Sequence, residues 1–141
     1  MNANTVPIVT VSDGMKSNGK LSFFQNSEKI AFTIKRIYYI YGAEKNTKRG
    51  MHAHKELEQI TFCPYGTIRF RLDDGLSKEE IILNEPNKGL YIGKGIWREM
   101  YWEEDNSVLV VAASMLYDEN DYIRDYETFL SMVKSGYWVR K

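Results

Sequence analysis

Short apolar runs separated by turn residues dominate the chain. Each run is rich in β-branched and aromatic residues and is bounded by Gly, Pro, Asn or Asp, as in Asn18-Gly19 and Asp73-Asp74-Gly75. Many short strands at this spacing are typical of a sandwich or a barrel. The pattern predicts strands over residues 8–11, 21–25, 33–41, 59–64, 67–72, 79–83, 89–93, 99–103 and 108–114.

Helical periodicity occurs only near the C-terminal end. Beyond Asp121, apolar residues recur three and four positions apart, which indicates one amphipathic helix. Its apolar positions are Ile123, Tyr126, Phe129, Leu130 and Val133. We expect Gly136 to end this helix and the helix to pack outside the β structure. The fold class that follows is all-β with a C-terminal helix.

Composition narrows the class of protein. The chain has 141 residues, no internal repeat and no linker-like segment, so we expect a single domain over residues 1–141. Nineteen basic and nineteen acidic residues balance, which argues against a nucleic-acid partner. The longest apolar run, residues 107–114, is too short to span a membrane, and residues 1–11 lack the features of a secretion signal. We therefore expect a cytoplasmic protein without a membrane partner.

The only two histidines of the chain, His52 and His54, are two residues apart. In an extended segment they lie on one face of a strand, with Ala53 on the other. Glu58, four residues after His54, would lie on the same face as the two histidines if the alternation continued. Taken alone, the spacing slightly favours two solvated surface histidines. As a pair in one cavity, however, they could act as a base and its neighbour, because imidazole titrates near neutral pH.

The wider context resembles the first motif of the cupins, in which a Gly, the His-x-His pair, a Glu and a second Gly follow one another. These residues are Gly50, His52, His54, Glu58 and Gly66. Metal-binding cupins take a third His from a second motif, and Arg98 stands at the matching position here. A guanidinium cannot ligate a divalent metal and repels it, so we expect no metal at this site. A site of two His and one carboxylate remains the alternative.

A tyrosine- and arginine-bearing strand is predicted over residues 33–41. Alternation places Arg36 and Tyr38 on one face, and Lys35, Ile37 and Tyr39 on the other. The Tyr38 hydroxyl can both donate and accept a proton, which is useful beside a histidine pair. Arg49, just before Gly50, could bind phosphate oxygens with its planar fork, although a surface loop position is about as compatible with the sequence.

Taken together, these segments resemble the dTDP-4-keto-6-deoxyglucose 3,4-ketoisomerase family of cupin enzymes. The resemblance rests on residues 34–40, 49–55, 57–59, 73–75, 89–93, 97–100 and 117–124. It implies a cupin barrel of the jelly-roll type, a dTDP-linked sugar as substrate, a homodimer and no cofactor. It also implies that His52 removes the proton from carbon 3 of the sugar and that Tyr38 moves a proton between two sugar oxygens. His54 is the third catalytic candidate, and the implied substrate-binding residues are Arg36, Arg49, Glu58, Arg98 and Asn18.

Some positions depart from the family pattern or leave alternatives open. The residue before Gly19 influences product stereochemistry in the family, where it is Tyr or Arg, and here it is Asn18. We interpret residues 121–124 as an attachment of the C-terminal helix to the barrel. The alternative functions are a 3,5-epimerase on the same nucleotide sugar, a metal-dependent cupin enzyme, and a sugar-binding module without catalysis.

Overall fold

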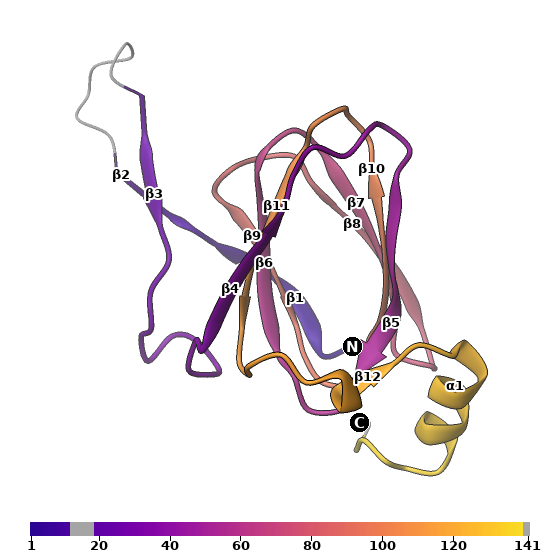
Figure 1. Cartoon of the computed structure of the whole chain (residues 1–141). Helices are drawn as coiled ribbons and strands as arrows, with labels where there is room; N and C mark the ends of the chain where they lie inside the picture. Colours follow the sequence, from indigo (N-terminus) through magenta and orange to yellow (C-terminus); the bar gives the residue numbers. More distant parts are fainter. Residues whose placement is uncertain (12–18, 140–141) are drawn as a thin grey trace.

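Two five-stranded antiparallel sheets face each other in the computed structural model, which describes residues 1–11 and 19–139 (Figure 1). The first sheet has the order β1 (Ala3–Pro7), β9 (Lys88–Ile92), β6 (Gln59–Tyr65), β11 (Val108–Ala113) and β4 (Arg36–Ile40). The second has the order β12 (Tyr122–Ile123), β5 (Lys48–His54), β10 (Trp97–Trp102), β7 (Ile68–Asp73) and β8 (Lys78–Leu83). A separate hairpin pairs β2 (Val9–Val11) with β3 (Leu21–Phe23).

The main core lies between the two sheets and follows from strand alternation. Phe70 and Leu72 on β7 and Leu90 and Ile92 on β9 are buried, while the residues between them are more exposed. Trp102 is fully buried, and its indole N–H donates to the Ser107 carbonyl at 2.8 Å. The large rings predicted from composition therefore fill the space between the sheets.

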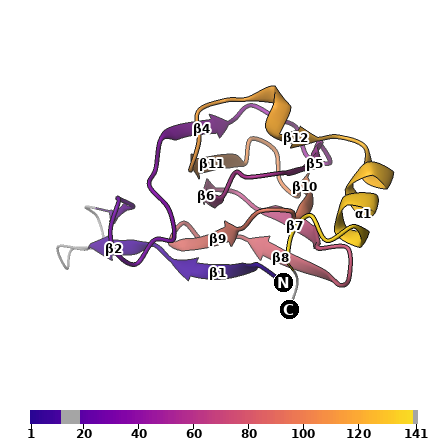
Figure 2. The same ribbon diagram turned by 90° about the horizontal axis from the view of Figure 1, so that it is seen from below.

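The helix α1 (Tyr126–Lys134) lies outside the sheets, beside β5 and β12 (Figure 2). The Asp125 side chain caps its N-terminus by accepting from the Thr128 amide at 2.9 Å. Ser135 is the C-cap, and Gly136 follows with φ of +79°, so the predicted helix end is confirmed. Phe129 on α1 packs with Ala53 and Trp97 in a second apolar cluster under the helix.

All nine predicted strands form, with ends shifted by one to three residues, and the all-β class with one C-terminal helix is confirmed. The predicted strand over residues 33–41 is only β4, because residues 33–35 belong to the preceding loop. Three strands lie outside that set: β5, whose extended conformation was only a condition of the histidine argument, and β1 and β12, which were not predicted. The helix begins later than its apolar period suggests, because Tyr122 pairs with His54 and Ile123 with Ala53 across β5. A long-range pairing of this kind leaves no periodic signal in the sequence.

An irregular register between β5 and β10 positions the residues around the histidines. Arg98 pairs with His52 and Glu99 with Gly50, so Met51 is an extra residue on β5. Gly50 and Met51 both have positive φ, +90° and +56°. This is a β-bulge, which shifts the alternation of side chains by one residue. Arg49 and His52, three positions apart, are therefore brought to the same side of β5.

The described part of the chain, residues 1–11 and 19–139, contains no helix that is long and apolar enough to cross a membrane.

Candidate active site

A cavity of about 500 Å³ opens between β4 of the first sheet and β5 of the second. We call it the histidine cavity. Its size is in the range of pockets that hold small organic ligands. It is lined by residues of β4, β5, β10 and the segment that follows β11, namely Arg36, Tyr38, Ile40, Lys48, Arg49, Gly50, Met51, His52, Met100, Tyr117, Tyr122 and Arg124.

Of the histidine pair, His52 lines this cavity and the buried His54 lies directly beside it. The rings of His52 and His54 are on the same face of β5, with centroids 4.9 Å apart and planes nearly perpendicular. Ala53, between them, is buried on the other face under α1. The predicted alternation is therefore confirmed, and the interpretation as two solvated surface histidines is wrong because His54 is only 1% exposed.

The tautomer of His54 is set by Asp121. The His54 Nδ1–H donates to Asp121 Oδ2 at 3.1 Å. Asp121 also accepts from the backbone amides of Glu56 and Leu57, at 2.7 and 3.2 Å, so the carboxylate is held in place. Because Nδ1 carries the hydrogen, Nε2 of a neutral His54 presents a lone pair. Within the described residues this buried Nε2 has no hydrogen-bond partner.

Both histidines are neutral at physiological pH. Burial, followed by the nearby Arg98 guanidinium, lowers the pKa of His52 to about 3. The pKa of His54 is lowered by the same two causes and then by His52. A neutral imidazole is the form that can accept a proton, so His52, which lines the cavity, is available as a base.

Tyr38 reaches the cavity from β4, opposite the histidines. The Gln59 Nε2 amide donates to the Tyr38 hydroxyl at 2.9 Å, and Arg98 Nη1 donates to Gln59 Oε1 at 2.5 Å. Arg98 is 2% exposed, and its Nε and Nη2 donate to the Ile96 carbonyl. Burial raises the pKa of Tyr38, so its hydroxyl keeps its proton at neutral pH. Tyr38 can therefore serve as an acid while His52 serves as a base.

The opening of the cavity is cationic. Among the described residues its lining includes Arg36, Lys48, Arg49 and Arg124 but no carboxylate. Arg36 lies over the rings of Tyr38 and Tyr117, at 5.3 and 5.8 Å from the centroids. Arg124 already donates to Glu119 at 2.8 and 3.0 Å, and Lys48 pairs with Glu99 at 3.3 Å, so Arg36 and Arg49 are the guanidinium groups of this lining that best suit an anionic ligand such as a phosphate or a diphosphate.

The structure brings most of the predicted site residues together, with two exceptions. The Tyr91 hydroxyl donates to Glu58 Oε1 at 2.6 Å, and Glu58 does not line the histidine cavity. The expected parity of Glu58 with the histidines is wrong because β5 ends at His54 and β6 begins at Gln59, so alternation does not continue between them. Gln59 takes the inward position instead. The second exception, Asn18, lies outside the described residues.

Residues 117–124 contribute to the site in a way that the sequence interpretation missed. Ile123 does pack under α1, as an attachment of the helix would. Tyr122 and Arg124, however, line the cavity, and the Tyr122 ring lies 5.1 Å from His52 and 4.4 Å from His54. The pairing of β12 with β5 causes this placement. The alternation within residues 121–124 was the signal that could have revealed it.

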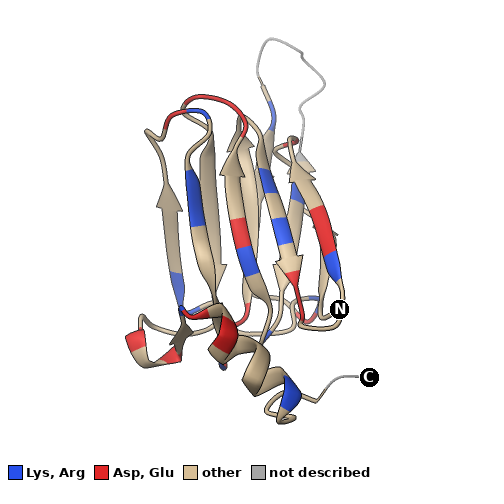
Figure 3. Cartoon of the chain, turned by 90° about the vertical axis from the view of Figure 1, so that its right-hand side faces the viewer, with Lys and Arg blue, Asp and Glu red and all other residues tan. Residues whose placement is uncertain are grey.

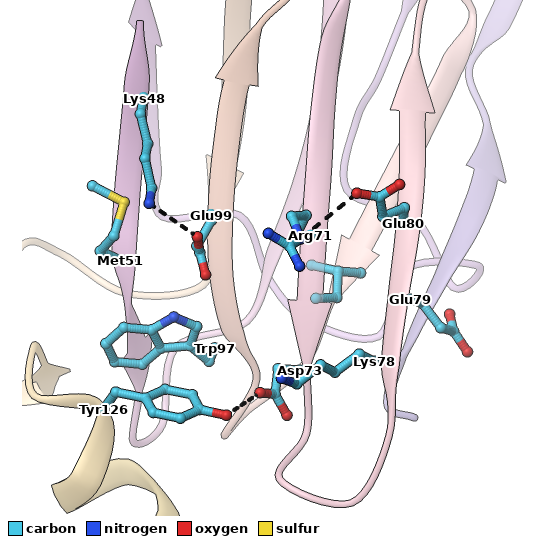
Figure 4. Close-up of a pocket in the computed structure, with 11 residues that line it drawn as sticks. Lys48, Met51, Arg71, Asp73, Lys78, Glu79, Glu80, Trp97, Glu99 and Tyr126 are labelled. Carbon is cyan, nitrogen blue, oxygen red and sulfur yellow. Dashed lines mark hydrogen bonds and ion pairs between the residues drawn. The ribbon is translucent and has the colours of Figure 1, made fainter.

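A second hollow of about 420 Å³ lies on the outer face of the β5–β10–β7–β8 sheet, beside α1 (Figure 4). Its polar groups already contact one another: Lys48 pairs with Glu99 at 3.3 Å, Arg71 with Glu80 at 3.6 Å, and the Tyr126 hydroxyl donates to Asp73 at 2.5 Å. Basic and acidic residues alternate across the strands of this face (Figure 3). Such cross-strand pairs account for the charges without a ligand.

No group of three or more His, Cys, Asp or Glu side chains in a metal-binding arrangement is found in the part of the chain that the structure describes. After burial, the charge of the Arg98 guanidinium is the next cause that lowers the pKa of both histidines, and it disfavours any further positive charge there.

A neutral imidazole and a protonated phenol face one cavity below a cationic opening, and this arrangement suits proton transfer on an anionic substrate. The fold and the site thus define an acid–base enzyme built on two antiparallel sheets. Comparison with known proteins identifies the family to which this enzyme belongs. A model of the family described as "FdtA: WxcM-like, C-terminal" matches residues 1–134, and the chain belongs to this family.

Relatives agree with this assignment. A TDP-4-oxo-6-deoxy-alpha-D-glucose-3,4-oxoisomerase from Aneurinibacillus thermoaerophilus is 45% identical over 113 residues, which is 80% of this chain and 81% of the relative. The crystal structure of a 3,4-ketoisomerase from Helicobacter canadensis has a TM-score of 0.88 at 45% identity, covering 95% of this chain and 98% of its own. QdtA from Thermoanaerobacterium thermosaccharolyticum, a sugar 3,4-ketoisomerase solved with TDP, has a TM-score of 0.89 at 37% identity, covering 97% and 98%.

Proposed function

We propose that this protein is a sugar 3,4-ketoisomerase that converts dTDP-4-keto-6-deoxyglucose to the 3-keto isomer, in the synthesis of deoxysugars. The observation that carries the proposal is the histidine cavity, which a neutral His52 and a protonated Tyr38 line together with Arg36, Arg49 and Arg124. The name of the relative from A. thermoaerophilus supports the same substrate.

The reaction begins with proton removal at carbon 3. The neighbouring carbonyl at carbon 4 makes this hydrogen acidic, and His52 accepts it. The electron pair of the broken C–H bond forms the double bond between carbons 3 and 4, while Tyr38 donates a proton to the oxygen on carbon 4. The product of this half is a neutral enediol. His52 is the base because it is neutral and lines the cavity.

The second half reverses these roles. The hydroxyl on carbon 3 returns a proton to Tyr38 as its carbonyl forms, and the imidazolium of His52 delivers a proton to carbon 4. Atoms and electrons balance without an oxidant, so no cofactor is required. The negative charges of the diphosphate oppose the effect of Arg98 on His52 and raise its pKa towards that of an effective base.

His54 and Arg98 assist the His52 imidazole and the Tyr38 hydroxyl in this reaction. His54 stays neutral beside His52, with ring centroids 4.9 Å apart, so no second positive charge opposes proton uptake by His52. The Arg98 guanidinium stabilises negative charge that develops on the enediol oxygens. Arg36 and Arg49 bind the diphosphate.

We further propose a cupin barrel for the fold and a homodimer for the assembly, with a cytoplasmic location and no nucleic-acid or membrane partner. The facing antiparallel sheets support the first proposal. The second is supported by an apolar outer face on β4, where Ile37 and Tyr39 are 56% and 61% exposed. Exposed apolar surface of this kind marks protein–protein interfaces.

The test of function is the position of the carbonyl in the product. The protein is incubated with dTDP-4-keto-6-deoxyglucose, and carbon-13 NMR follows the carbonyl. We expect it to move from carbon 4 to carbon 3. A carbonyl that stays at carbon 4 with inverted neighbours would identify an epimerase, and binding without any change would identify a sugar-binding module.

A further inference from the structure

Gln59 connects the two buried groups that flank the histidine cavity. It is the first residue of β6, is 5% exposed, and lies between Arg98 and Tyr38. Its side chain accepts one hydrogen bond and donates another: Oε1 accepts from Arg98 Nη1 at 2.5 Å, and Nε2 donates to the Tyr38 hydroxyl at 2.9 Å. Arg98 therefore fixes the orientation of the Gln59 amide, and through this amide it determines whether the Tyr38 hydroxyl donates or accepts.

The direction of the two bonds follows from chemistry alone. A guanidinium has only donors, so the amide oxygen of Gln59 must face Arg98 and the amide nitrogen must face Tyr38. Arg98 cannot turn away easily, because its Nε and Nη2 donate to the Ile96 carbonyl at 3.1 and 2.9 Å. The Tyr38 oxygen is consequently an acceptor towards Gln59.

This arrangement leaves the Tyr38 hydroxyl with the two capacities that the reaction needs. A phenol has one donor hydrogen, and its oxygen can accept. With Gln59 as donor on the inner side, the hydrogen of Tyr38 is not used there, and no other hydrogen bond of this hydroxyl is found within residues 1–11 and 19–139. One donor and one acceptor position therefore remain for the substrate.

We propose that Gln59 is a positioning residue, which fixes the Tyr38 hydroxyl so that its hydrogen points to the sugar oxygens. This inference rests on the proposed ketoisomerase function. In that reaction Tyr38 first donates to the oxygen on carbon 4 and then accepts from the hydroxyl on carbon 3. A tyrosine whose hydrogen pointed at an internal acceptor could perform neither step in the required order.

The variant Gln59→Glu reverses the direction of the bond. A carboxylate beside Arg98 is ionised and only accepts, so it takes the Tyr38 hydrogen and leaves the substrate without a donor. We expect kcat to fall by about 10²-fold, within the range of a general-acid contribution, with the KM nearly unchanged. Tyr38→Phe should show a similar loss, and the double variant should be no slower than Tyr38→Phe alone, since both changes remove the same donor.

Thr61→Val is the matched control, because Thr61 lies two residues further along β6, is 2% exposed, and has a hydroxyl without a partner in the described structure. It should keep wild-type kcat. Should Gln59→Glu fail to fold, as judged by circular dichroism, Gln59→Met removes both bonds and should lower kcat about tenfold, again without further loss in Tyr38→Phe.

The role of Gln59 would be contradicted if the losses in kcat of Gln59→Glu and Tyr38→Phe multiply in the double variant. A Gln59→Glu enzyme with wild-type kcat would contradict it as well. Wild-type protein that fails to convert the substrate would instead contradict the proposed function. The wild-type assay is therefore run first, so that the two failures are distinguished.

Discussion

At the scale of single residues, the histidine cavity depends on one buried cation. Arg98 is 2% exposed, and burial lowers its pKa to about 10, which still leaves it charged at neutral pH. After burial, its charge is the next cause that lowers the pKa of both His52 and His54. Burial and Arg98 together thus keep the proposed base unprotonated, and Arg98 orients the proposed acid, Tyr38, through Gln59. The same side chain would repel a metal ion from the histidines.

The shifted histidines make stability depend on pH. In the unfolded chain each histidine titrates near pH 6.5, whereas His52 in the folded chain titrates at about pH 3. Between these values the unfolded chain binds more protons, so the free energy of unfolding falls as pH falls. We expect each histidine to lower it by about 2 kcal/mol between pH 7 and pH 5. Urea unfolding of wild type and His52→Asn at both pH values measures this.

Over the same pH interval, the free energy of unfolding of the His52→Asn protein should fall by about 2 kcal/mol less than that of wild type, because asparagine does not titrate. Equal losses in the two proteins would show that His52 titrates normally in the folded chain.

At the scale of elements, the bulge in β5 brings the proposed base, His52, and the proposed anion-binding residue, Arg49, into the lining of one cavity. In a regular strand, alternation would place Arg49 and His52, which are three positions apart, on opposite faces, and the bulge at Met51 removes this difference. The bulge needs Gly50, which has φ of +90° and whose added Cβ would lie 2.9 Å from the Arg98 carbonyl oxygen. Bulges beside active sites often re-aim side chains in this way.

The variant Gly50→Ala should disturb this geometry. Positive φ alone destabilises an L-residue by about 1–2 kcal/mol, and overpacking against β10 adds about 1–3 kcal/mol. Gly42→Ala is the control, because Gly42 has φ of +76° and nothing within 4 Å of the added Cβ. We expect thermal unfolding to show the larger loss for Gly50→Ala, together with a fall in kcat/KM. Equal losses for the two variants would contradict the steric argument.

The elements also show what the sequence could predict. Alternation correctly gave the faces of β4 and of the His-x-His segment, because a side chain's face depends only on parity within a strand. It failed for Glu58, which follows the end of β5, and it assigned no face to Arg49, which precedes the bulge. The Gly in Arg49-Gly50-Met51 was the only local sign of that bulge. The Asp121–His54 and Gln59–Tyr38 contacts join residues distant in sequence, so no local pattern indicates them.

At the scale of the whole molecule, the apolar outer face of β4 and the projecting β2–β3 hairpin have no partner within the described chain (Figure 1). Tyr41 is 70% exposed beside Tyr39, and Leu21 on β3 is 61% exposed. A second copy of the chain placed on this face would bury these side chains and stabilise the assembly through the hydrophobic effect.

We therefore predict twice the 16.5 kDa chain mass by light scattering at micromolar concentration. Tyr39→Arg should shift the protein towards the monomer, because a charge would be buried at the interface. Ile82→Arg is the control, since Ile82 is also exposed but lies on β8 of the opposite sheet. A monomeric wild type would overturn this prediction, and equal effects of the two variants would place the interface elsewhere.

The central claim, that His52 moves the proton of a keto-sugar, is tested most directly in heavy water. Wild type and His52→Asn are each incubated with dTDP-4-keto-6-deoxyglucose, and proton NMR follows the hydrogens on carbons 3 and 4. For wild type we predict loss of the carbon 3 hydrogen, and deuterium on carbon 4 to the extent that the His52 imidazolium exchanges its proton with solvent before returning it. For His52→Asn we predict at least about 10²-fold slower conversion, although the nucleotide sugar still binds. Near-normal conversion and deuterium uptake by His52→Asn would contradict the account.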